Sequence, residues 1–217
     1  MYTKHQWKSE QHFNFQYVQY LPKDFDPNKK YPLVFFLHGA GERGEDLDVS
    51  QRHGYMKYVR EQGKDYPFIF VGPQCPFDKY WGCYTESLLA FLDYICETLP
   101  VDRDRIILTG LSMGGTGTWM LAMAAPDRFS CMVPVCGSGI CWYGGIIKHI
   151  PIRIYHGDLD EVVPIAESIT MLKAIHRNGG HAELNICYGL GHNAWDVAYQ
   201  DDALIDWMLQ QRKSANQ

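Results

Sequence analysis

Short apolar runs, each ending at or next to a glycine or proline, recur along this 217-residue chain. They are YPLVFFLHG from position 31, YPFIFVGP from 66, RIILTG from 105, CMVPVCG from 131, IRIYHG from 152 and AELNICY from 182. Runs of this length that are apolar almost throughout are typical of strands buried on both faces of a sheet. The less regular alternation over residues 13–20 predicts a further strand, at an edge of the sheet.

The segments between these runs repeat their apolar residues at helical spacing, over residues 86–99, 113–125, 165–178 and 198–212. In the first of them, Leu88, Leu92 and Ile95 fall on one face of a helix. Alternating strands and helices predict an α/β fold, with a mainly parallel central sheet and helices on both of its faces. Because 46% of the residues are apolar, the chain can bury one sizeable core, and we expect a single domain over residues 1–217.

The run RIILTG leads into Gly110-Leu111-Ser112-Met113-Gly114, which matches the pattern G-x-S-x-G. The motif thus follows the carboxyl end of a predicted strand. Functional residues are expected there, since ligands of a parallel sheet bind at the carboxyl ends of its strands. The two glycines let strand and helix pack closely while the serine hydroxyl points outward. The amide of Met113 opens the helix, where it can stabilise a developing anion. The pattern predicts Ser112 as a nucleophile; a glycine-rich turn with a solvated serine is the alternative.

A serine nucleophile needs a base, and the base needs an orienting carboxylate. His192 lies in GLGHNAWD, just after the run AELNICY, and the run IRIYHG is followed by Asp158, Asp160 and Glu161. The order serine, acid, histidine is that of α/β-hydrolases. Spacing favours Asp160 only slightly, so all three carboxylates stay open at this point. Two further histidines, His38 and His156, each lie at the end of a strand. We expect each of them to brace the turn that follows its strand.

A tetrahedral intermediate needs two donors for its oxyanion, and Met113 supplies only one. The loop in FFLHGAGERGED is the expected second source, through the amide of Ala40 or Gly41. A flexible turn after the strand is the alternative interpretation. An ion pair between Glu42 and Arg43 would fix this loop.

The remaining composition excludes several classes of partner. The net charge of -5 and the isoelectric point near 6.0 come from scattered charges, so we expect neither nucleic acid nor a membrane as partner. The first 20 residues contain no apolar h-region and no small-residue cleavage site, which favours a cytoplasmic location.

The seven cysteines form no C-x-x-C pair and are expected to be reduced thiols that pack as small apolar groups. A disulfide between Cys75 and Cys83, or between Cys136 and Cys141, is the alternative. No cluster has zinc-ligand spacing, so neither a metal nor an organic cofactor is expected.

Taken together, these pieces resemble the α/β-hydrolase superfamily, and within it the phospholipase/carboxylesterase and predicted-peptidase group, which is similar to polyhydroxybutyrate-depolymerase-like and feruloyl esterases. The resemblance runs over residues 17–212 and is carried by LHGAGERGED, VGPQCPFDKYW, VDRDRIILTGLSMGGTGTWMLAMAAPDRF, PVCGSG, IYHGDLDEVVP and GLGHNAWDVAY. The family pattern H-G-x-x-D-x-x-V-P implies Asp160 as the catalytic acid. The resemblance likewise implies Ser112 as nucleophile, His192 as base, and the amides of Ala40 and Met113 as the oxyanion hole.

The function implied by this resemblance is that of a serine carboxylesterase, which acts on a small-molecule ester through an acyl-enzyme. Only a short segment separates PVCGSG from IPIRIYHG. We therefore expect no large lid domain, and an open site for short to moderate esters.

Trp81, Trp142 and Trp195, together with Gly41, are candidates for an acyl or aryl pocket, and ordinary packing is the alternative for each tryptophan. A serine peptidase of the prolyl-oligopeptidase type and a catalytically silent binding protein are the competing functions. The sequence leaves the acyl group and the oligomeric state open.

Overall fold

A computed structural model, which describes residues 2–213, contains an eight-stranded sheet in the order β1-β2-β4-β3-β5-β6-β7-β8. The pairs β1–β2 and β2–β4 are antiparallel, and all other neighbours in the sheet are parallel. The predicted α/β fold with a mainly parallel sheet is therefore confirmed. The strands are β1 (Tyr2–Gln6), β2 (Gln16–Tyr20), β3 (Tyr31–Leu37), β4 (Ile69–Pro73), β5 (Val101–Leu111), β6 (Cys131–Val135), β7 (Ile152–Gly157) and β8 (Ala182–Cys187).

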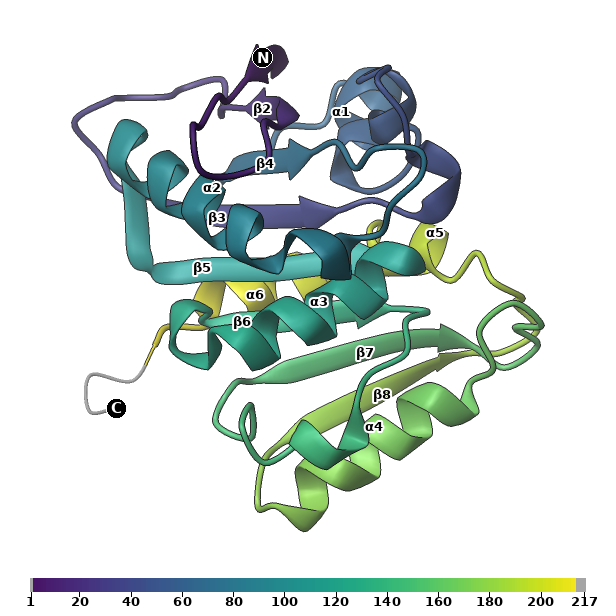
Figure 1. Cartoon of the computed structure of the whole chain (residues 1–217). Helices are drawn as coiled ribbons and strands as arrows, with labels where there is room; N and C mark the ends of the chain where they lie inside the picture. The colour runs from purple at the N-terminus through teal and green to yellow at the C-terminus, as the bar shows by residue number, and fades with distance from the viewer. Residues whose placement is uncertain (1, 214–217) are drawn as a thin grey trace.

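Helices cover both faces of this sheet (Figure 1). In the view of Figure 1, α2, α3 and α4 lie in front of the strands and α6 lies behind them. The predicted helices over residues 86–99, 113–125 and 165–178 correspond to α2, α3 and α4, each shifted by no more than a residue at either end. The α-helices of the described chain are α1 (Tyr55–Gln62), α2 (Thr85–Thr98), α3 (Met113–Ala124), α4 (Ala166–Arg177), α5 (Trp195–Ala198) and α6 (Asp202–Gln210).

Strand β3 shows how one apolar run supplies two layers of core. Leu33, Phe35 and Leu37 are fully buried in the cluster that includes residues of α2, α3 and α4. Val34 and Phe36 belong instead to the cluster that includes residues of α1 and α6. Successive side chains of a strand point to opposite faces, so a strand between two helical layers must be apolar throughout.

The strand predicted at an edge over residues 13–20 lies inside the sheet, so that part of the prediction is wrong. Strand β2 starts only at Gln16 and pairs with β1 on one side and β4 on the other. The edge strand on this side of the sheet is β1, whose sequence YTKHQ is largely polar and mostly exposed. Because an edge strand with solvent beside it needs no apolar run, the sequence pattern does not reveal it.

The helix predicted over residues 198–212 is divided in two. Helix α5 ends at Ala198, and α6 begins only at Asp202. Asp201 between them has an extended backbone, and its carboxylate accepts a 2.9 Å hydrogen bond from the amide of Ala203. This is the geometry of an N-cap, which satisfies an amide that has no partner inside the helix.

The state of the cysteines and the character of the helices concern the disulfides considered above and the membrane. All seven thiols are free, so neither the Cys75–Cys83 nor the Cys136–Cys141 disulfide is formed. Within residues 2–213, no helix combines the length and the apolar character needed to cross a membrane.

Candidate active site

Ser112 occupies a strained turn between the end of β5 and the start of α3. Its φ of 54° and ψ of -118° lie in a region that side chains other than glycine rarely adopt. The turn is anchored by a 2.8 Å hydrogen bond from the Ser112 amide to the carbonyl of Val135 on β6. The chain therefore holds this serine at the carboxyl edge of the sheet in a conformation that a surface turn has no need to adopt.

Two glycines make this turn sterically feasible. A Cβ on Gly114 would lie 1.8 Å from the carbonyl oxygen of Leu37, which ends the neighbouring strand β3. A Cβ on Gly110 would lie 2.4 Å from the carbonyl oxygen of Gly114. Both obstacles are backbone atoms, which cannot rotate away. The G-x-S-x-G pattern thus lets β3, β5 and α3 touch directly below the serine.

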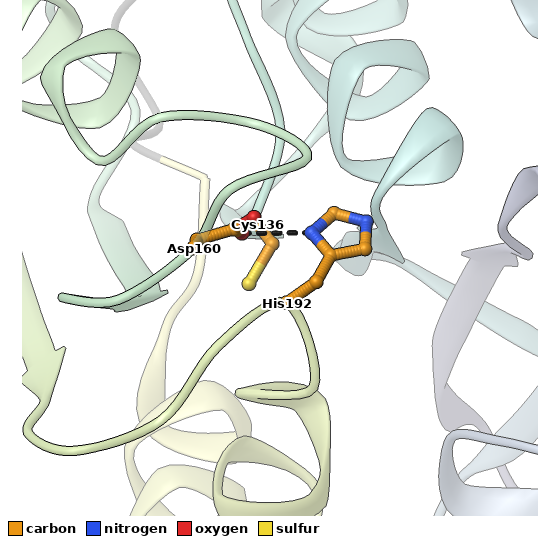
Figure 2. A group of neighbouring side chains, drawn as sticks. All are labelled: Cys136, Asp160 and His192. Atoms are coloured by element: carbon orange, nitrogen blue, oxygen red, sulfur yellow. Dashed lines mark hydrogen bonds and ion pairs between the residues drawn. The ribbon is translucent and has the colours of Figure 1, made fainter.

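A chain of hydrogen bonds joins Ser112, His192 and Asp160 from the loops after β5, β8 and β7. The Ser112 hydroxyl lies 2.7 Å from His192 Nε2. His192 Nδ1 lies 2.7 Å from Asp160 Oδ2, and Figure 2 shows this second contact. Because the carboxylate can only accept, Nδ1 carries the ring proton and Nε2 accepts from the serine hydroxyl. This arrangement can move the serine proton to the imidazole. Of the other two carboxylates considered, Glu161 is exposed and Asp158 accepts from the amide of Gly189.

The Asp160 carboxylate is buried and fully hydrogen-bonded. Its second oxygen, Oδ1, accepts 2.9 Å hydrogen bonds from the amides of Val162 and Val163. Burial raises the pKa of this carboxyl group, but the hydrogen bonds from His192 and from the two amides outweigh it, so the pKa of Asp160 lies below its usual value. Asp160 is therefore ionised at neutral pH and can stabilise a positive charge on the imidazole.

His156 braces the turn that carries Asp160. It is completely buried, with Nε2 2.7 Å from the carbonyl of Val163 and 3.2 Å from Asp160 Oδ2. Both of these oxygens are acceptors, so Nε2 carries the proton and donates to the Val163 carbonyl. On the other side of the ring, the Ser168 hydroxyl lies 2.7 Å from Nδ1 and donates to it. The expected bracing role is confirmed, and the contact with Asp160 adds a link that the sequence does not show.

His38 braces the loop after β3 in a similar way. Its Nε2 accepts from the amide of Cys75 at 3.0 Å, so Nδ1 carries the proton and donates to the carbonyl of Gly39 at 2.7 Å. Burial lowers the pKa of His38 to about 4, which keeps the ring neutral. The carbonyl of His38 accepts a 2.9 Å hydrogen bond from the indole of Trp81. This histidine therefore connects the loops after β3 and β4.

The loop that was expected to supply an oxyanion donor begins a 3₁₀ turn at Ala40, which is exposed beside the site. Arg43 holds the turn, because its side chain donates to the carbonyl of Ala40 at 3.0 Å and to that of Lys79 at 3.2 Å. The expected ion pair between Glu42 and Arg43 is not formed, since Glu42 is buried and lies 3.7 Å from Nε2 of His53. Arginine can reach two carbonyls at once, and this fixes the loop without the ion pair.

The four candidates for a substrate pocket occupy different surroundings. The ring of Trp195 stands nearly perpendicular to that of His192, with centroids 5.2 Å apart. Trp81 is buried and also lines an apolar cavity of about 370 Å³. Trp142 projects into solvent with 87% of its surface exposed. Gly41 is exposed in its loop, with nothing within 4 Å of the place where a Cβ would stand.

Cys136 lies beside Asp160 and His192, and the ligand atoms of the three residues fall within 4.8 Å of one another (Figure 2). Such a group could in principle surround a metal ion. However, burial raises the pKa of the Cys136 thiol to about 12, so the sulfur is protonated at neutral pH. Metal binding would also have to displace the proton that His192 and Asp160 share. The donor set therefore fits a hydrogen-bonded pair better than a metal site.

A mainly parallel eight-stranded sheet, with a strained serine after β5 and a bonded acid and histidine after β7 and β8, defines an α/β-hydrolase. The family model described as "Putative esterase" matches residues 9–144, which is more than half of the chain. The chain belongs to this esterase family.

Similar proteins agree with this assignment. Feruloyl esterase C of Emericella nidulans is 30% identical over 76% of this chain and 62% of its own length. The crystal structure of a thermostable esterase is 31% identical with a TM-score of 0.87, over 97% of this chain and 63% of that one. The feruloyl esterase module of Clostridium thermocellum, complexed with sinapinate, shares the fold at 16% identity, with a TM-score of 0.77 over 100% of this chain and 90% of that one. The chain thus spans about three fifths of feruloyl esterase C and of the thermostable esterase.

Proposed function

We propose that this chain is a serine carboxylesterase that hydrolyses small-molecule esters through an acyl-enzyme. The observation that carries the proposal is the unbroken chain of two 2.7 Å hydrogen bonds from the Ser112 hydroxyl through His192 to the ionised Asp160. Membership in the esterase family supports ester hydrolysis as the reaction. The feruloyl esterases among the similar proteins support a carboxylic ester as the substrate.

In the acylation step, His192 Nε2 accepts the proton of Ser112 as the serine oxygen attacks the ester carbonyl. Asp160 holds the imidazole in the tautomer that has a free Nε2 lone pair, and stabilises the imidazolium once it forms. His192 then donates the proton to the departing alcohol. These transfers leave the acyl group on the Ser112 oxygen.

The negative charge on the carbonyl oxygen requires donors at its developing position. The amide of Met113 is one, because it opens α3, where first-turn amides have no partner inside the helix. The amide of Ala40 is the second, on the turn that Arg43 holds. In deacylation His192 activates a water in the same way, and the acid leaves while Ser112 regains its proton.

Hydrolysis of p-nitrophenyl acetate tests this function. We expect turnover in the native chain and in the control variant Ser9→Ala, and loss to background in Ser112→Ala, because removing a triad serine lowers kcat by up to about 10⁶-fold. Turnover that survives in Ser112→Ala would contradict the proposal.

A matched p-nitroanilide, which differs from the ester only at the scissile atom, tests the competing peptidase. Esterase function predicts hydrolysis of the ester and background rates with the anilide. Comparable kcat/KM values for both would favour a peptidase.

A further inference from the structure

An apolar groove runs along α3, away from Ser112. One cavity, of about 370 Å³, is lined on one side by residues 80–83, which include most of the 3₁₀ turn Trp81–Tyr84, and on the other by Met113 and Met120 of α3. A second, of about 230 Å³, adjoins it at Met120 and is lined further by Ile140 and other apolar residues of the segment between β6 and β7. Together the two cavities form what we call the α3 groove.

The position of the groove ties it to the proposed reaction. It begins at Met113, whose amide is the proposed oxyanion donor and whose neighbour is Ser112. It extends to Ala124, the last residue of α3, a distance of about 16 Å at the helical rise of 1.5 Å per residue. A chain attached to the carbonyl carbon can therefore enter the groove at one end and lie along the helix.

The groove walls, which are mostly apolar and uncharged, favour an apolar ligand. Among the described residues that line either cavity, no side chain is charged. Most of the side chains in its walls are apolar, and two of the polar ones have partners within the chain: Trp81 donates to a carbonyl at 2.9 Å, and the hydroxyl of Thr116 accepts from the amide of Ser138 at 3.0 Å. The hydroxyls of Tyr80 and Tyr143 belong to side chains that are more than half exposed. A saturated chain gains free energy by burying its methylenes against the apolar part of these walls.

Two other cavities of the described chain differ from the α3 groove in their charge and in their position relative to Ser112. One lies at the β1 edge and is lined by Lys4, Glu45 and Asp46. Another lies between residues 64–67, which follow α1, and helix α6, and is lined by Lys64 and Asp202, among others. Both are charged, and neither is lined by a residue adjoining Ser112. Unlike these two cavities, the α3 groove is apolar and begins at the residue that follows Ser112.

The topology of the sheet decides which half of the ester fits. The departing alcohol must lie against His192, which protonates it, and His192 follows β8. The groove begins under the turn that contains Trp81, which follows β4 on the opposite side of β5 from β7 and β8. The departing alcohol and the first cavity of the groove, which the chain enters beside Met113, thus lie on opposite sides of β5. This leaves the groove to the acyl chain.

We infer that the α3 groove binds the acyl chain of the substrate, and that the preferred substrates are esters of saturated, medium-chain acids, whose extended chains can lie along a groove about 16 Å long. The inference rests on the proposed esterase function and names its substrate class. Each methylene that enters the groove should raise kcat/KM by about fourfold until the groove is filled.

The test is a series of p-nitrophenyl esters from acetate to dodecanoate, each below its micelle concentration. Met120→Trp fills the junction of the two cavities, and Leu209→Trp places the same group in the charged cavity between residues 64–67 and α6 as a matched control. We expect kcat/KM to rise with chain length in the native chain and the control. In Met120→Trp the ratio of kcat/KM for octanoate to that for acetate should fall at least tenfold.

A second variant covers the case in which Met120→Trp does not fold. Ile140→Asp puts a charge on an exposed wall of the far cavity, so it should lower kcat/KM for decanoate but not for butyrate. A series of alkyl acetates, in which the alcohol lengthens instead, should show no comparable gain.

The outcomes separate this inference from the function on which it rests. Acetate turnover with a flat chain-length profile, a gain that persists in both variants, or a gain confined to the alkyl acetates would overturn the acyl groove alone. Failure to hydrolyse any ester in the series would overturn the esterase function, and the groove with it.

Discussion

Removing the contact between His156 and the Asp160 turn should slow catalysis more than it destabilises the fold. His156 is completely buried, and its Nε2 donates to the carbonyl of Val163, whose own amide donates to Asp160. Replacing His156 by leucine leaves that carbonyl buried without a partner, and loosens the turn that aims Asp160 at His192. An unsatisfied buried group of this kind costs about 1–3 kcal/mol.

If all of this cost of about 1–3 kcal/mol is added to the activation free energy, kcat falls by about 5- to 150-fold, because 1.4 kcal/mol corresponds to a factor of ten. His156→Gln should recover much of this loss, since a glutamine amide can present an N–H near the position of Nε2. KM should change little, because His156 does not face the substrate. The loss of a donor near the carboxylate should also move the acid limb of the pH–rate profile to higher pH.

The assay is p-nitrophenyl acetate hydrolysis over a range of pH, with urea unfolding of the same variants. Ser168→Ala is a second probe, because it removes the hydroxyl that donates to Nδ1 of His156 without touching the Asp160 turn. An unchanged kcat in His156→Leu, with the whole effect in the free energy of unfolding, would refute the reasoning. Equal losses in His156→Leu and His156→Gln would do the same.

Two further predictions concern stability. The pKa of His38 is about 4 in the folded chain against 6.5 for the unfolded one, so its contribution is complete above pH 6.5 and is lost as the pH falls toward 4. The total loss is about 3 kcal/mol, and urea unfolding of His38→Gln should show a correspondingly flatter pH dependence; identical slopes would contradict this. Gly114→Ala should lower the free energy of unfolding by at least about 3 kcal/mol, since its Cβ would meet a backbone oxygen at 1.8 Å. Gly41→Ala, where nothing lies within 4 Å, should change it by less than about 0.5 kcal/mol, and similar effects at both glycines would show that close backbone approach is not the cause.

The parts of the fold that sequence patterns predict are those in which burial dictates residue type. Strand β3 must be apolar at every position because it lies between two helical layers, so its run is visible in the sequence. Strand β1 and helix α1 cannot be predicted from the sequence pattern, because burial does not dictate most of their residue types. The first is a mostly exposed edge, and the second, YMKYVREQ, is short and largely polar. Neither shows the extended periodicity on which such predictions depend.

Some features of the candidate site can likewise be predicted from the sequence, and others cannot. Ser112 is visible because its strained turn requires glycines at fixed positions, and His192 because it follows a strand. The contacts of Glu42 with His53 and of Arg43 with the carbonyl of Lys79 cannot be predicted from the spacing of Glu42 and Arg43, since these partners are brought close only by folding. The contact of His156 with Asp160 is similar, because it depends on how the turn after β7 closes on itself.

Covalent labelling with a fluorophosphonate, followed by intact-protein mass spectrometry, tests most directly whether Ser112 is an activated nucleophile. We expect one adduct on the native chain, located on the peptide that contains Ser112. The adduct should be absent from Ser112→Ala and form far more slowly on Asp160→Asn, where the imidazole loses the partner that fixes its tautomer. An adduct that forms equally fast on Ser112→Ala, or on a different residue of the native chain, would contradict the account.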